Sequence, residues 1–215
     1  MTVGPVSAVP AAGDPSAAGA RPGRLSPRFV DKGAVFAGYV GIGMAIVIAI
    51  AFALIIPVQT LVFIAAILGG VLIGAYANQR SNRWRPMRRV FLNAIWAALV
   101  TGFSLALIWG ILRLTFVFLD SGMTPSGQAI SCQTGPDCTW KRYVADGQGE
   151  ELAAAGVTDG DSFGRYFVSE AVIGGGGLII GFTMLGALVA AGFRSVQKPP
   201  PDAPVEGTFI PRKRD

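Results

Sequence analysis

The feature that most constrains this chain is a set of apolar stretches, each long enough to cross a lipid bilayer. A helix needs about 20 mainly apolar residues to span the hydrocarbon core. Such stretches lie at about 34–56, 60–77, 90–119 and 166–193. Hydrophobic residues make up 52% of the 215 residues, charged residues only 14%, and the mean hydropathy is +0.52. We therefore predict an all-α membrane protein with four transmembrane helices.

The boundaries between the spans follow from their lengths. The first two spans together contain 44 nearly uncharged residues, which as one helix would measure about 66 Å. That is twice the hydrocarbon thickness, so we expect a tight turn at Pro57, Gln59 and Thr60. The third span has 30 residues and should tilt or project beyond the membrane. In the fourth, four consecutive glycines at 174–177 predict close packing or a helix break.

The charge distribution predicts the orientation. Segments 1–33, 78–89 and 194–215 carry 4, 5 and 5 Lys/Arg, whereas segment 120–165 carries 3, together with 7 Asp/Glu. Basic residues favour the cytoplasmic side, so we expect both termini inside and 120–165 as an outer loop. The 14 Arg against 4 Lys suggest a GC-rich bacterial genome, and the predicted location is the bacterial plasma membrane, as a multi-pass protein.

The two terminal segments are expected to lack a fixed fold. Residues 1–33 are rich in Ala, Pro, Gly and Ser, which bury too little apolar surface to order a chain, so we predict a disordered cytoplasmic arm. It has no apolar core typical of a signal peptide, and the first span should remain as an anchor. The tail 194–215, with three prolines from Pro199, should be extended.

The sequence contains no His, and this restricts the chemistry that the chain can perform. His is the commonest metal ligand and the usual acid or base near neutral pH. Its absence removes His-ligated haem, most zinc sites and any Ser-His or Cys-His pair within the chain. We therefore predict a protein that is not an enzyme, has no metal site and needs no cofactor, although a pigment, quinone or lipid could bind through apolar contacts without a motif.

Cys132 and Cys138 are predicted to form a disulfide in the outer loop, where the environment is oxidising. They enclose a turn-forming segment with Gly135 and Pro136 at its centre. The five intervening residues differ from the C-x-x-C redox spacing, so a structural clip is favoured over a redox-active or metal-binding pair.

Arg113 is the only basic residue inside the four spans, and a charge at such a depth is by default a candidate for function. Glu170 lies a similar distance inside the outer end of the fourth span, so we predict an Arg113–Glu170 ion pair. Two alternatives are that Arg113 extends to the outer interface, toward Asp120, or that it serves a ligand, a lipid phosphate or a proton path.

Small residues four positions apart allow two helix backbones to approach closely. The second span contains Gly70 and Gly74 in this spacing, and the fourth contains Gly177 and Gly181. Two interpretations stay open for these glycines. They either pack this chain's own helices together or form a docking face for another subunit or a second copy.

The densest basic cluster lies beside the membrane, in the predicted cytoplasmic loop 78–89. Its members are Arg80, Arg83, Arg85, Arg88 and Arg89. Contact with anionic lipid headgroups is the favoured interpretation, with docking of a cytoplasmic partner as the alternative, and no nucleic acid is expected as a partner. Another charged segment, Asp159 to Ser162, faintly resembles a calcium loop but lacks EF-hand spacing, so Asp161 or Ser162 is predicted as a helix cap.

These observations favour a non-catalytic accessory or assembly subunit of a larger bacterial membrane complex, with other membrane proteins as partners. The alternative is a small oligomeric transporter or channel in which Arg113, Glu170 and Asn93 face a wet cavity. A membrane enzyme ranks third, because the outer-loop carboxylates show no recognisable spacing.

Overall fold

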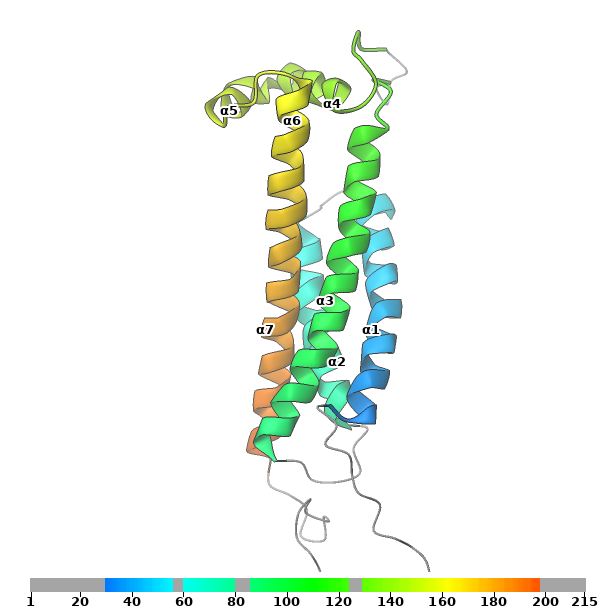
Figure 1. The fold of residues 1–215 in the computed structure, drawn as a ribbon, viewed down its shortest axis with the longest axis vertical. Coiled ribbons are helices and arrows are strands. Elements are labelled where there is room, and N and C mark those ends of the chain that lie inside the picture. Colours follow the sequence, from blue (N-terminus) through cyan, green and yellow to red (C-terminus); the bar gives the residue numbers. More distant parts are fainter. Residues whose placement is uncertain (1–29, 56–59, 80–85, 124–128, 198–215) are drawn as a thin grey trace, which may run out of the picture.

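The computed structural model describes residues 30–55, 60–79, 86–123 and 129–197. Four helices in it are long and apolar enough to cross a membrane, which confirms the predicted helical membrane architecture (Figure 1). The first comprises α1 (Lys32–Ile50) and the π-helical η2 (Ala51–Ile55). The second is α2 (Leu61–Gln79) and the third is α3 (Met87–Phe118).

The fourth long helix is continuous from Gly160 to Val196. It consists of α6 (Gly160–Phe167), the π-helical η4 (Val168–Gly174) and α7 (Gly175–Val196). The glycine run therefore does not break the helix. A wider π turn ends where the run begins, and such turns often occur at functional sites.

Several helix ends differ from the predicted spans. α1 begins at Lys32 rather than 34, and the fourth helix begins at Gly160 rather than 166. α3 begins at Met87, so the last part of the predicted loop 78–89 is helical. The start of α6 has a physical reason that apolar periodicity does not reveal, because the Asp159 side chain caps it by accepting a hydrogen bond from the Ser162 backbone N–H.

The helices pack as a diamond, with α2 and α3 in the middle and α1 and α7 on opposite sides (Figure 1). Alanine dominates the buried core. The helices approach most closely between α2 and α7, where Gly70 faces the Thr183 backbone, Gly74 faces Ala187 and Gly186 faces Ile67. A Cβ at any of these glycines would overlap the facing helix.

α1 and α2 are shorter at one end than α3 and the fourth helix (Figure 1). The Phe63 ring, in the first turn of α2, lies 6.4 Å from the Trp109 ring of α3, so Trp109 marks where the α1–α2 pair ends. α3 continues beyond this level to Phe118. The longer helices thus form a step above the shorter pair.

A small helical cap covers the projecting ends of α3 and α6. It contains α4 (Pro136–Tyr143), η3 (Val144–Gln148) and α5 (Gly149–Ala154), which lie across the bundle axis (Figure 1). Leu152 of α5 and the following Val157 pack with Val117 of α3 and with Phe163 and Phe167 of α6. Thus the cap is a packed unit built on the two long helices.

Candidate functional sites at the membrane boundary and on helix α7

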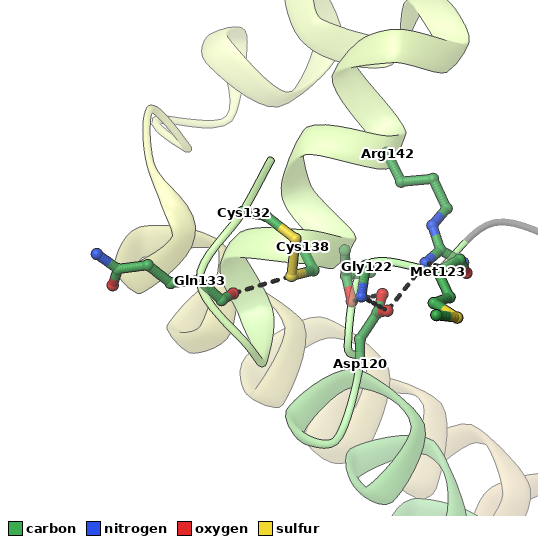
Figure 2. A network of polar contacts seen from close by, with 8 residues as sticks. Asp120, Gly122, Met123, Cys132, Gln133, Cys138 and Arg142 are labelled. Carbon is green, nitrogen blue, oxygen red and sulfur yellow. Dashed lines mark hydrogen bonds and ion pairs between the residues drawn. A yellow bond between two sulfur atoms is a disulfide. The ribbon is translucent and has the colours of Figure 1, made fainter. Parts of the chain in front are cut away.

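The predicted disulfide between Cys132 and Cys138 is present, with the two Cα atoms 5.0 Å apart. Cys138 lies in the first turn of α4 and is fully buried. The bond closes the segment that leads into the cap, beside Gly122 at the end of α3 (Figure 2). This position fits the interpretation of the pair as a structural clip.

Asp120 joins the cap to α3 (Figure 2). One carboxylate oxygen accepts hydrogen bonds from the Gly122 backbone N–H and from Nη2 of Arg142, each at 2.9 Å. The other accepts one from the Thr139 hydroxyl at 3.0 Å. Arg142, which the sequence analysis did not single out, therefore occupies the carboxylate that was one alternative partner for Arg113.

Arg113 lies one helical turn beyond Trp109 on α3, between aromatic rings. Its guanidinium carbon is 5.6 Å from the Trp109 ring centroid and 5.1 Å from that of Phe167. Both distances are within the range of favourable cation–π contacts. Rings from two different helices therefore hold the charged group at the step.

Arg113 and Glu170 both line a cavity of about 410 Å³. Within the described residues, however, no ion pair of 4.0 Å or less joins them. Glu170 lies in η4 and is exposed. Direct pairing is thus not confirmed. The same cavity is also lined by Glu151 and Tyr166, which belong to the cap and α6.

A second and larger cavity, which we call the outer crevice, lies over the step. It has a volume of about 540 Å³. Its walls include Phe52 and Ala53 of η2, Trp109, Arg113 and Phe116 of α3, and Asp120 and Arg142. The side chains of Arg113, Tyr143 and Phe167 line both cavities. Of these lining residues, sequence reasoning had identified only Arg113 as a candidate site; Arg142 was detectable only as a charge in the outer loop.

The two glycine pairs have different surroundings. Gly70 and Gly74 are buried against α7, which supports the packing interpretation for them. Gly177 and Gly181 lie on the opposite face of α7, and a Cβ at either position would meet no described atom within 4 Å. Only the second pair is left on the outside of the bundle.

The other end of the bundle has a polar cluster that the sequence analysis missed. The side-chain amide of Asn93 donates to Asp31 at 2.9 Å, and the Asp31 backbone N–H donates back to Asn93 at 3.1 Å. Arg89 pairs with the same carboxylate at 3.3 Å. Asn93 is only 1% exposed and is buried within the bundle. Of the predicted basic cluster, Arg80, Arg83 and Arg85 lie outside the described residues.

The segment at Asp159 starts a helix. The Asp159 carboxylate accepts a hydrogen bond from the Ser162 backbone N–H at 2.7 Å, and the Ser162 hydroxyl lies 3.0 Å from the Asp159 nitrogen, which donates to it. The hydrogen bonds that the Asp159 carboxylate accepts from Ser162 lower the pKa of Asp159 below its ordinary value. Asp159, rather than Asp161 or Ser162, is therefore the N-cap, and Ser162 completes a capping box.

Comparison of the chain with protein-family models, with curated proteins and with solved structures finds no match.

Proposed function

We propose that this protein is a non-catalytic accessory subunit of a larger bacterial membrane complex and that α7 docks against a transmembrane helix of a partner. The observation that carries the proposal is the outward position of Gly177 and Gly181 on α7. Glycine weakens a helix by about 1 kcal/mol relative to alanine. Gly70 offsets that cost through packing inside the bundle, whereas a Cβ at Gly177 or Gly181 would meet no atom of another described helix.

The shape of the outward face suits a helix as its occupant. Leu178 and Leu185 flank the glycine pair and are each 51% exposed. A glycine depression between larger apolar side chains allows two helix backbones to approach, which gains van der Waals contact that lipid chains do not provide. Lipid chains would cover an ordinary apolar face. The lack of side chains at Gly177 and Gly181 therefore favours a protein helix as the occupant.

The interior of the bundle gives less support to the alternative of a transporter or channel. Thr101 and Thr183 are buried, and their hydroxyls donate to carbonyl oxygens of their own helices. Asn93 is engaged with Asp31. A pore would therefore require several copies, and these would meet through their outer faces.

The proposed orientation puts the cap outside the cell. The Lys32 end of α1 and the Val196 end of α7 lie together at the opposite end of the bundle (Figure 1). That end is close in sequence to the basic segments, which favours a cytoplasmic location. The disulfide in the cap fits the oxidising side of the membrane. The cap would then be available to a second, extracytoplasmic contact with the complex.

The test is purification of the full chain from its source membrane in a mild detergent, followed by mass measurement and subunit identification. We expect fixed stoichiometry with a larger membrane protein, and loss of that protein when Gly181→Leu fills the depression. Gly43→Leu is the matched control, because Gly43 also faces open space but lies on α1, on the opposite side of the bundle. A lone monomer or homo-oligomer, or equal effects of both changes, would reject the proposal.

A further inference from the structure

We propose that the outer crevice binds the phosphate of an anionic phospholipid from the outer leaflet. The site is separate from the outward glycines of α7, so the inference does not depend on the docking of that face; it rests on the proposed orientation, which puts the crevice at the outer leaflet. It rests on the position of Arg113 relative to the membrane, on the charge of the crevice walls and on the apolar surface that leads from the crevice toward the bilayer.

The position of Arg113 follows from the lengths of the helices. α2 contains 19 residues and is therefore about 28 Å long, close to the hydrocarbon thickness of about 30 Å. Trp109 is level with the first turn of α2. Arg113 lies one turn farther out, by about 6 Å. The Cα of Arg113 therefore lies close to the level of the lipid phosphates on the outer side, with its guanidinium carbon 5.6 Å from the Trp109 ring centroid.

The walls of the outer crevice have a positive net charge. Arg113 and Arg142 line it, with Asp120 as the carboxylate. Asp120 pairs with Arg142 and also accepts hydrogen bonds from Thr139 and the backbone of Gly122, so the charges of Asp120 and Arg142 largely offset each other and the net positive charge is that of Arg113. A guanidinium carries five N–H donors and suits phosphate oxygens. The adjacent cavity contains Glu151 and Glu170 and would repel an anion, which assigns the phosphate to the outer crevice.

The remaining walls suit the apolar part of a lipid. Phe52 and Ala53 come from the outer end of the first helix, and Trp109 and Phe116 come from α3. Phe116 is 54% exposed on the surface of the bundle. A lipid with its phosphate at Arg113 would extend its chains past these side chains toward the membrane centre. The volume, about 540 Å³, is within the usual range of about 300–1,000 Å³ for small-molecule sites.

The test is native mass spectrometry of the full chain in detergent, titrated with phosphatidylglycerol. We expect Arg113→Gln to bind one lipid fewer than the unchanged protein at the same lipid concentration. The apparent affinity of the crevice for that lipid should fall about tenfold, as for loss of one charge-assisted hydrogen bond. Arg165→Gln is the matched control, because Arg165 is exposed on α6 and lines neither cavity. Lipid bound by the arginines at the other end of the bundle is unaffected by either change, so the difference between the two variants reports on the crevice.

Ala53→Trp provides a second variant, which fills the crevice from the first helix and leaves every charge in place. It should also remove one phosphatidylglycerol, even if Arg113→Gln proves too unstable to purify. Phosphatidylcholine should bind more weakly at this site, and inorganic phosphate should not compete. Equal lipid binding by Arg113→Gln and Arg165→Gln, or unchanged binding by Ala53→Trp, would overturn the proposal. Full displacement of phosphatidylglycerol by inorganic phosphate would show that the crevice binds free phosphate rather than a lipid.

Discussion

Gly70 on α2 lies so close to Thr183 on α7 that a Cβ on Gly70 would overlap the Thr183 carbonyl oxygen. The Thr183 hydroxyl donates to the Ile179 carbonyl of its own helix at 2.7 Å, so it needs no hydrogen-bond acceptor on the facing helix. This contact sets the distance between the two backbones. It also explains why one of the two predicted glycine pairs is not available for docking.

The first prediction compares the two glycine pairs. Gly70→Val should destabilise the bundle by about 1–3 kcal/mol, because it overpacks a closed interface. Gly181→Val should leave the free energy of unfolding nearly unchanged, because a Cβ there meets open space. Reversible unfolding in mixed micelles, followed by circular dichroism, measures both. Equal destabilisation by the two changes would show that the α2–α7 contact is wrongly placed.

The second prediction concerns the contact between Asn93 and Asp31. Asn93→Leu keeps a similar volume but leaves the Asp31 carboxylate and backbone N–H without their Asn93 partner. We expect a loss of about 1–3 kcal/mol, with faster amide exchange in the first turn of α1. Ser104→Ala is the control, because Ser104 donates only to the Val100 carbonyl of its own helix. If both variants are equally stable, the contact does not anchor the start of α1.

The third prediction separates the cap from the bundle. Replacing Cys132 and Cys138 with Ser should loosen α4, because the disulfide closes the segment that leads into it. For a loop with a sequence separation of 6, the chain-entropy account gives roughly 2 kcal/mol. We expect faster protease cleavage near Lys141 and Arg142 while the four long helices keep their unfolding midpoint. A parallel loss of stability in the bundle would mean that cap and bundle unfold together.

The fourth prediction is a pH dependence at the start of α6. Hydrogen bonds from Ser162 lower the pKa of Asp159 from its ordinary value of 3.8. A carboxyl with a lowered pKa stabilises the fold above its unfolded pKa, and this stability is lost as the pH falls through the folded pKa. Once exchange rates are corrected for intrinsic chemistry, protection of the Ser162 and Phe163 amides should therefore decrease below pH 4. Asp159→Asn retains a good N-cap that does not titrate, so its protection should be independent of pH in this range.

The long helices could be predicted from the sequence because membrane hydrocarbon imposes a length and a composition on each span. The four apolar stretches and the disulfide could be predicted without knowing which residues are neighbours in the fold. The helix ends were harder to predict. Asp31 was assigned to a disordered arm, because its partner Asn93 lies 62 residues away and nothing local indicates the contact.

The candidate sites could be predicted only in part, for a related reason. The depth shared by Arg113 and Glu170 follows from counting residues along two helices, and the cavity that both residues line agrees with it. Whether they touch depends on helix rotation, and a π turn at η4 changes the direction in which side chains point. Likewise, the spacing of Gly177 and Gly181 indicates close packing but does not distinguish an inner face from an outer one.

The central claim, that the outward face of α7 contacts another membrane protein, is tested most directly by photo-crosslinking in the source membrane. A photoreactive residue in place of Leu178 lies beside the glycines without filling the depression. The matched position is Val47 on α1, which is 67% exposed. We predict one adduct of defined mass with a different membrane protein from position 178 and none from position 47. No adduct from position 178, or adducts only between copies of this chain, would contradict the account.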